Sequence, residues 1–226
     1  MKTLALKDIS AVSLDDLLGG ISFFRELREV DPKQAEFLAT YARVMAADPG
    51  EVVIHHGDHD PSFYFLLRGQ LLVYPDDDHI KGEPLSIITP GHVFGALAMI
   101  CNVDRTATLV ADPSGGEVKL VAIDGTGFGE LNDYTRVRRH TKILFYRMVV
   151  ANTRWKLEVY RMQQPNHVIS RDMRKLELYR GTPNSEEELQ SLARQAQQMT
   201  VLLMRWNNLF YEEGSGDNGA SPINTA

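Results

Sequence analysis

The chain has 226 residues, of which 43% are hydrophobic, and a formal net charge of −6 at pH 7. This length fits one large domain or one domain with an appendage, and the apolar fraction suffices for a buried core. The acidic balance gives no support to general nucleic-acid binding, which needs a basic face. The single cysteine, Cys101, excludes an internal disulfide and indicates a reducing compartment.

The first residues, MKTLALKDIS, contain neither a long apolar run nor a small-residue cleavage site, so we expect no signal peptide. No apolar stretch of the chain approaches the ~20 residues that are needed to span a bilayer. We therefore expect a soluble, cytoplasmic protein.

Short helices are predicted over residues 12–45. Asp31 followed by Pro32 is a typical helix start, because proline fits the first helical position. Apolar residues then recur at helical spacing: Phe37, Leu38, Tyr41 and Met45. Asp48-Pro49-Gly50 ends this region, so residues 1–48 are predicted to be an N-terminal helical segment.

From residue 49 the pattern changes to short β-rich runs separated by glycine turns. The predicted strands are Val52–Ile54, Phe63–Leu67, Leu71–Tyr74, Leu85–Ile88, Thr106–Val110 and Val118–Ile123. Many short strands with glycine-rich turns favour a sandwich, a barrel or a roll. We predict such a β-domain over residues 49–128.

Two long helices are predicted after the β-domain. The first, within residues 129–165, covers 132–163 and ends before Pro165. Its predicted apolar stripe consists of Leu144, Met148, Ala151, Trp155 and Met162. A run of basic residues lies near its start: Arg136, Arg138, Arg139, His140 and Lys142. We interpret this run first as a solvated face, second as a contact to the acidic N-terminal region or a partner, and third as a DNA contact.

The second helix is predicted from about 185 to 212, at the end of a connector that begins at residue 166. Ser185 and Glu188 form a capping box at its start. Its apolar residues alternate by three and four in a heptad pattern: Leu189, Leu192, Ala196, Met199, Leu203, Trp206 and Phe210. This stripe must be buried either against the first long helix or against a second copy in a homodimer. Residues 213–226 are predicted to be a disordered tail.

The most informative segment is Phe94-Gly95-Ala96-Leu97-Ala98, followed by Arg105-Thr106-Ala107-Thr108. It resembles the phosphate cassette of the cyclic-nucleotide-binding domain family, which is roughly F-G-E-L-A, a short gap, and R-[ST/A]-A-T. Gly50-Glu51, Gly57-Asp58 and Pro90-Gly91 match the family's turns upstream. The resemblance implies an α+β fold of the catabolite-activator type: a jelly-roll-like β-roll, or double-stranded β-helix, with N-terminal helices and long C-terminal helices.

The chemistry of this segment suits a cyclic phosphate, which carries one negative charge. A short helix with free N–H groups supplies donors and a favourable dipole, and glycine lets the backbone come close. An arginine adds a charge-assisted contact. The cassette that the resemblance implies consists of Phe94, Gly95, Ala96, Leu97, Ala98, Arg105, Thr106 and Ala107.

One position departs from the family. Ala96 stands where the family usually has a glutamate that accepts a hydrogen bond from the ribose 2′-hydroxyl. An unmatched buried hydroxyl costs about 1–3 kcal/mol, which is roughly one to two decades of affinity. Three outcomes stay open: weak binding of cyclic AMP or cyclic GMP, binding of another ligand, or no ligand.

Other residues have simpler interpretations. Arg105 can pair with a neighbouring carboxylate such as Asp104 or Glu130 instead of an anion. A cluster of histidines, His55, His56 and His59, suggests a metal site, but alternating strand faces separate the first two and favour a solvated turn. Cys101 has no base beside it, so we expect an inert thiol. We expect no metal and no cofactor.

The leading hypothesis is a cyclic-nucleotide-sensing regulatory protein that is not an enzyme and has no DNA-binding domain. Residues 166–226 lack the two short helices and basic recognition helix of the winged helix-turn-helix in the family's transcription factors. Ligand binding would shift the long helix and alter contact with a protein partner. Trp155 and the residues around Arg147 are candidates near the nucleotide base. The alternative is an empty β-roll that acts as a dimeric interaction module; a divergent transcription regulator is third.

Overall fold

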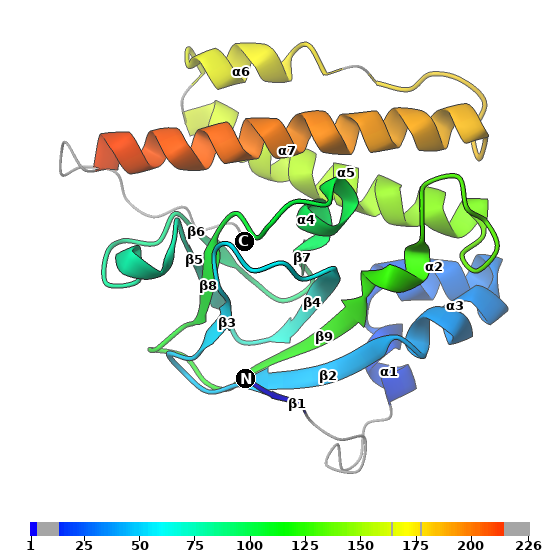
Figure 1. Cartoon of the computed structure of the whole chain (residues 1–226), viewed down its shortest axis with the longest axis horizontal. Helices are drawn as coiled ribbons and strands as arrows, with labels where there is room; N and C mark the ends of the chain where they lie inside the picture. Colours follow the sequence, from blue (N-terminus) through cyan, green and yellow to red (C-terminus); the bar gives the residue numbers. More distant parts are fainter. Residues whose placement is uncertain (4–13, 164, 177, 215–226) are drawn as a thin grey trace.

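The computed structural model describes residues 1–3, 14–163, 165–176 and 178–214. The described strands form two antiparallel sheets (Figure 1). The first has the order β1-β2-β9-β4-β7, with strands Lys2–Thr3, Ala42–Ala47, Val118–Asp124, Ser62–Arg68 and Val93–Phe94. The second has the order β3-β8-β5-β6, with strands Val52–Ile54, Thr108–Ala111, Leu71–Tyr74 and Ser86–Ile88.

Helices lie on two sides of these sheets. The helices α1 to α4 are Leu14–Gly19, Ser22–Val30, Pro32–Ala39 and Ala96–Cys101. The helices α5 to α7 are Arg139–Gln163, Val168–Met173 and Glu186–Gly214. In Figure 1, α5 and α7 run together above the roll, and α4 lies between α7 and the strands.

The two sheets face each other and enclose an apolar core. Their inward side chains form one buried cluster: Ala47, Val53, Ile54, Tyr64, Leu66, Leu71, Ile88, Phe94, Ala107, Leu109, Ala111, Val118, Leu120 and Ala122. Along β4, Tyr64 and Leu66 belong to this core, whereas Phe63 and Phe65 face the N-terminal helices and α5. Successive residues of a strand point to opposite faces, so β4 serves both cores. The prediction of an α+β β-roll is confirmed.

The N-terminal helices pack on the outer face of the first sheet. Aromatic rings fill this contact: Phe23, Phe24, Phe63, Phe65, Phe128 and Phe145. Asp31 caps α3, because its side chain accepts a hydrogen bond from the Gln34 N–H at 3.3 Å, and Pro32 is the first helical residue. This helix start agrees with the prediction.

The sequence pattern predicted helical structure as far as residue 45, and this prediction is wrong. Residues 42–47 are strand β2, which pairs with β9 in a register that places Met45 opposite Leu120. The spacing of Tyr41 and Met45 fits a helix locally. Pairing with a strand more than seventy residues later in the chain decides the structure instead.

The helix α5 begins at Arg139, later than the predicted start at residue 132, and buries different faces from those expected. Of the predicted stripe, Leu144 and Met148 pack in the core, but Trp155 and Met162 are 53% and 75% exposed, so its later part is wrong. One face, including Phe145 and Val149, packs against the N-terminal core. A second face packs against α7 through Ile143, Val150, Leu157 and Tyr160. Because α5 buries two faces, its apolar residues are spread around the helix and do not form a single stripe in the sequence.

Part of the basic run contacts the N-terminal helices, although Arg136, Arg138 and Arg139 are exposed. Arg138 Nη1 lies 2.5 Å from Asp31 Oδ2, and His140 Nε2 lies 3.1 Å from the same oxygen. Lys142 is buried and donates to the backbone carbonyl of Glu130. The two contacts to Asp31 correspond to the second interpretation of the run, a contact to the N-terminal region, and they fix the start of α5 relative to α3. The exposed arginines correspond to the first interpretation, a solvated face.

The heptad stripe of α7 is buried within the chain. Its buried members are Leu189, Leu192, Ala196, Met199 and Trp206. They pack with residues of α5 and α6, and Trp206 stacks on Tyr160 with ring centroids 4.9 Å apart. Of the two predicted partners for the stripe, the described contacts are those with the first long helix. The side chain of Phe210 and residues 215–226 lie outside the described part of the chain.

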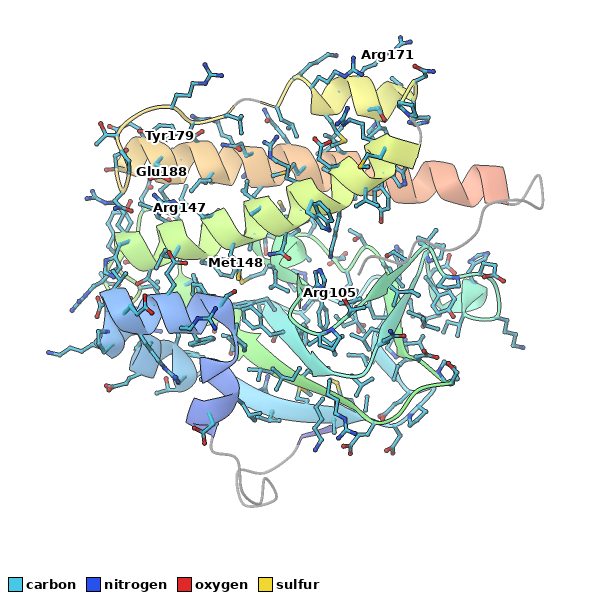
Figure 2. All side chains as sticks on the ribbon, turned by 180° about the vertical axis from the view of Figure 1, so that it is seen from behind. Arg105, Arg147, Met148, Arg171, Tyr179 and Glu188 are labelled. Atoms are coloured by element: carbon cyan, nitrogen blue, oxygen red, sulfur yellow. The ribbon has the colours of Figure 1, made fainter. Side chains whose placement is uncertain are left out.

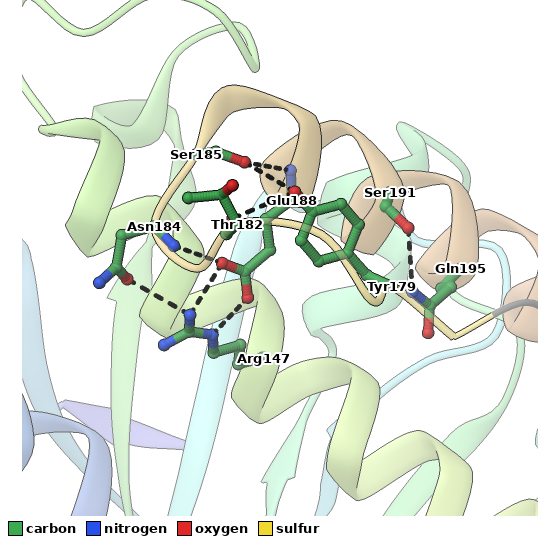
Figure 3. A network of polar contacts seen from close by, with 8 residues as sticks. All are labelled: Arg147, Tyr179, Thr182, Asn184, Ser185, Glu188, Ser191 and Gln195. Carbon is green, nitrogen blue, oxygen red and sulfur yellow. Dashed lines mark hydrogen bonds and ion pairs between the residues drawn. The ribbon is translucent and has the colours of Figure 1, made fainter.

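An ion pair joins α5 to the beginning of α7 (Figures 2 and 3). Arg147 donates from Nε and Nη2 to the two carboxylate oxygens of Glu188, at 2.7 and 2.8 Å. Glu188 also accepts from the Asn184 N–H at 2.6 Å, and its own N–H donates to Ser185 Oγ at 3.1 Å. The hydrogen bond from Glu188 to Ser185 is the predicted cap. Tyr179 contacts Ser185 and extends the network to the preceding loop.

Candidate functional site

A cavity of about 160 Å³ lies between the roll, α4 and α5. All eight predicted cassette residues line it: Phe94, Gly95, Ala96, Leu97, Ala98, Arg105, Thr106 and Ala107. The loop and first turn of α4 form one part of the wall, and the segment before β8 forms the part beside it. The fold therefore brings the two halves of the sequence motif to one place.

Gly95 and Arg105 are in direct contact. Gly95 has a φ of +77°, and Arg105 Nη1 donates to its carbonyl oxygen at 2.8 Å. A Cβ atom at position 95 would lie 2.6 Å from Nη1, which no real contact tolerates. Glycine is required here both by the left-handed backbone and by the guanidinium. It also begins α4, whose first-turn N–H groups have no partner within the helix.

Arg105 is 3% exposed and is held by three acceptors. Besides Gly95, Nη2 donates to Asp60 Oδ2 at 2.7 Å and to the Ser62 carbonyl at 2.6 Å. Arg105 therefore pairs with a carboxylate, as one interpretation of the sequence expected, but the partner is Asp60 and not Asp104 or Glu130. Asp60 comes just before β4, and the strand brings it to the cassette.

The carboxylate of Asp60 is stabilised in its charged form. Burial by itself would raise its pKa, but hydrogen bonds from Tyr64, Arg105 and Ser62 outweigh burial and lower the pKa to about 2. Tyr64 Oη donates to Asp60 Oδ2 at 2.6 Å. Burial and this hydrogen bond raise the pKa of Tyr64 to about 12.

The three hydrogen bonds leave two N–H groups of Arg105 unused, one on Nη1 and one on Nε. Its Nε is buried and has no hydrogen-bond partner among the described residues. A buried donor without an acceptor is costly and rare in folded proteins. Because Arg105 also lines the cavity, an acceptor in the ligand is the natural partner for its remaining N–H groups.

Comparison with known proteins agrees with this arrangement. The family model described as the cyclic nucleotide-binding domain matches residues 44–133. Residues 44–133 belong to the cyclic nucleotide-binding domain family. The matched segment contains the second sheet, most of the first sheet, α4 and all the cassette residues.

Two curated relatives each match less than half of this chain. The acetyltransferase Pat of Mycolicibacterium smegmatis is 36% identical over 95 residues, which are 42% of this chain and 27% of that protein. The cAMP-dependent protein kinase regulatory subunit of Dictyostelium discoideum is 29% identical over 108 residues, which are 46% of this chain and 32% of that protein. The matches thus span about a third or less of these relatives' own length.

Solved structures also align with part of this chain, at low identity. The regulatory domain of Toxoplasma gondii PKA, crystallised with cAMP, aligns with a TM-score of 0.42 and 19% identity over 51% of this chain and 42% of that chain. A cyclic nucleotide-binding-like protein from Brucella abortus aligns with a TM-score of 0.38 and 22% identity over 49% of this chain and 89% of that chain.

Ala96 stands at the position where this chain departs from the pattern of the cyclic nucleotide-binding domain family. Ala96 is 3% exposed and lines the cavity. Its methyl group can accept no hydrogen bond. Among the described residues that line the cavity there is no carboxylate, so the wall offers no charged acceptor for a ribose hydroxyl.

Sequence analysis missed the helical wall of the pocket. It is formed by α5 through Val149, Asn152, Thr153, Lys156 and Tyr160. Of the earlier candidates on α5, Trp155 is exposed and is not part of the wall, and Arg147 is engaged with Glu188. The wall residues recur at spacings of three and four, so the sequence contained the periodic signal of one helix face. The sequence could not tell which face of α5 turns toward the roll.

The helix α4 also contacts α7. Cys101 Sγ lies 3.3 Å from Thr200 Oγ1, and Leu97 and Ile100 pack against the cluster between α5 and α7. Burial raises the pKa of the Cys101 thiol. The thiol is therefore a packing contact, in keeping with the expected inert role. Leu203 of α7 reaches the cavity itself.

The three histidines near β3 have separate surroundings. His55 Nδ1 lies 2.6 Å from Asp77, and His59 Nδ1 lies 3.0 Å from Asp104. In the described ranges no group of three or more His, Cys, Asp or Glu residues is arranged to hold a metal ion. Among the described helices, none has an apolar stretch of the length that crossing a membrane requires.

Proposed function

We propose that this domain binds a cyclic nucleotide in the cavity between the cassette and α5, and that the protein regulates a partner and is not itself a catalyst. The buried Nε of Arg105, which has no partner among the described residues, is the observation that carries the proposal. Phosphate oxygens at this place would accept from Arg105 and from the free N–H groups at the start of α4. Thr106 adds a hydroxyl to the same wall.

Ala96 sets the strength of this binding. A ribose 2′-hydroxyl that finds no acceptor lowers affinity by roughly one to two decades. We therefore expect binding weaker than a glutamate at this position would give, and little discrimination between ribose and 2′-deoxyribose ligands. Measuring both sugars tests this expectation.

The helices over the cavity support a role in signal relay. A volume of about 160 Å³ is smaller than the ~300 Å³ at the lower end of small-molecule sites. A nucleotide would therefore have to move α5, and with it Leu203 of α7, away from the roll. Because Arg147 and Glu188 join the two helices, we infer that they move together. Their displacement would alter the surface offered to a protein partner.

The output of this movement is proposed to be a protein contact. The stripe of α7 that suggested a homodimer is already covered within the chain, so a dimer or another partner would use the outer faces of the helices. Exposed apolar residues lie there, among them Trp155 and Val201. The described residues after α5 form one short and one long helix, which supports a protein contact over a DNA contact.

A second candidate function is an interaction module whose roll holds no ligand. The ion pair of Arg105 with Asp60 favours it, because the charge of the arginine is already balanced. The missing acceptor at Ala96 favours it as well. Under this proposal the helices would bind a partner irrespective of any nucleotide.

A thermal-unfolding panel separates the two candidates. Cyclic AMP, cyclic GMP and cyclic di-GMP are added to the wild-type chain and to Arg105→Lys, which keeps a cation beside Asp60 but loses the guanidinium fork. A sensor is stabilised by one of the ligands by mass action, and the variant is stabilised less. Hydrogen exchange with that ligand should then change in α5 and α7. Equal melting temperatures with and without all three ligands would favour the interaction module.

A further inference from the structure

A lysine on the helical wall of the pocket has no role in the proposal so far. Lys156 lines the cavity from α5, on the same face as Asn152 and Tyr160. In the part of the chain that the structure describes, its ammonium group makes no hydrogen bond and no ion pair. A lysine has three donors and no acceptor, so only an acceptor or an anion can satisfy it.

The charges around Lys156 leave its own charge unbalanced. On the roll side, Arg105 is neutralised by Asp60 at 2.7 Å. On α5, Tyr160 is the other titratable group of the wall, and burial raises its pKa. The side chains that α4 and α7 contribute to the lining are apolar. Lys156 is therefore the uncompensated cation among the described residues that face the cavity.

Lys156 is half-buried, and a partly desolvated ammonium ion without a counterion is unfavourable. Burial accordingly lowers the pKa of Lys156 to about 8. An anion in the cavity would reverse this effect, because an opposite charge nearby favours the protonated amine. The pocket thus holds a cation that an anionic ligand would satisfy.

We propose that Lys156 neutralises the negative charge of the ligand and contacts the cyclic phosphate from α5 while Arg105 and α4 contact it from the roll. The inference rests on the proposed function, since it requires an anionic ligand in this pocket. Two cations on opposite walls clamp the anion between them. The charge of the ligand then holds α5 in its ligand-bound position on the roll, which links recognition to the position of the helix.

A pH dependence follows from this contact. Below pH about 8 the free protein carries the Lys156 proton, and binding needs no proton uptake. Above this pH the free amine is neutral and must take up a proton when the anion binds. The affinity for the ligand therefore falls by up to tenfold per pH unit, from about pH 8 to the higher pKa of the bound form.

Calorimetric titration of the full chain with cyclic AMP and cyclic GMP, at about pH 7 and about pH 9.5, tests this contact. The variants are Lys156→Met, which keeps the length without the charge, and Lys156→Arg, which stays charged at both pH values. Lys156→Met should weaken both nucleotides by the same factor, roughly tenfold to a hundredfold at the lower pH. Lys156→Arg should retain affinity and lose the fall at the higher pH.

Three results would overturn the inference, and they are distinct. If Lys156→Met binds both nucleotides as tightly as the wild type, with the same pH dependence, the inference is wrong while the proposed function stands. If it weakens cyclic GMP alone, the lysine contacts the acceptor edge of guanine and not the phosphate. If the wild type binds neither nucleotide at either pH, the proposed function fails and the inference fails with it. Lys156→Arg keeps the charge. If this variant binds the nucleotides with an affinity that does not change with pH, the weaker binding of Lys156→Met is not caused by misfolding.

Discussion

Arg105 and Asp60 form an ion pair beside the pocket, with Nη2 of the guanidinium 2.7 Å from Oδ2 of the carboxylate. The pair and two further hydrogen bonds fix the arginine against Asp60, Gly95 and Ser62. A guanidinium that is already in position loses little further freedom when it binds an anion. The same pair explains why a buried arginine is tolerated beside the pocket.

Removal of the Asp60 charge should destabilise the fold. Asp60→Asn leaves Arg105 buried with a weaker partner, and we expect the free energy of unfolding to fall by about 1–3 kcal/mol. Denaturant unfolding measures the change, with the exposed Asp78→Asn as the matched control. The pKa of Asp60 is lowered to about 2, so its contribution is present above pH about 4 and lost as pH falls toward 2. The difference between wild type and Asp60→Asn should therefore shrink in this range. A difference that stays constant down to about pH 2 would contradict the assignment.

Substitution of Gly95 should impair both folding and binding. In Gly95→Ala the new methyl group would meet Arg105 Nη1 at 2.6 Å and force the guanidinium away. Gly91→Ala is the matched control, because Gly91 also has a positive φ, +91°, but no atom within 4 Å of its added Cβ. The control isolates the backbone strain, about 1 kcal/mol.

We expect both variants to lose stability and only Gly95→Ala to lose nucleotide affinity, by tenfold or more. Unfolding and binding measured on the same preparations give the comparison. Equal nucleotide affinity in the two variants would show that Gly95 does not position Arg105.

Restoring the acceptor that the sequence lacks should strengthen ribonucleotide binding. Ala96→Glu places a carboxylate on the cavity wall, where it can accept from a ribose 2′-hydroxyl. The expected gain in affinity is roughly tenfold for cyclic AMP or cyclic GMP. The 2′-deoxy form of the same nucleotide is the control, and it should show no gain. A gain of equal size for both sugars would mean that the new carboxylate acts in some other way.

The contact between α5 and α7 depends on Arg147 and Glu188. Arg147→Met removes both charge-assisted hydrogen bonds to Glu188, and because Arg147 is partly exposed we expect a loss of only about 1 kcal/mol. Hydrogen exchange should become faster in the first turns of α7, whereas Arg171→Met, at an exposed position, should change nothing (Figure 2). Unchanged exchange at the start of α7 in Arg147→Met would show that apolar packing alone holds the helix.

Local patterns predicted much of this fold. The strands of the roll, the cap at Ser185 and the buried stripe of α7 each follow from neighbouring residues, so the sequence pattern contains them. The cassette residues could be predicted to come together because their motif is specific. All eight line one cavity.

Features that depend on distant pairing could not be predicted. Strand β2 forms because it pairs with β9, and residues 42–47 contain no signal for that partner. Asp60 lies 45 positions before Arg105, so the nearer Asp104 was the natural candidate. The orientation of α5 depends on two packed faces at once, and for this reason Trp155 was placed near the pocket and Lys156 was overlooked.

The central claim is that the cassette binds a cyclic nucleotide through Arg105. The most direct measurement is isothermal titration calorimetry of the wild-type chain and Arg105→Lys with cyclic AMP, cyclic GMP and cyclic di-GMP. We expect one nucleotide to bind the wild type with a dissociation constant of about micromolar or tighter, and Arg105→Lys to bind it at least roughly tenfold more weakly. Binding that Arg105→Lys leaves unchanged, or no binding of any of the three to the wild type, would contradict the claim.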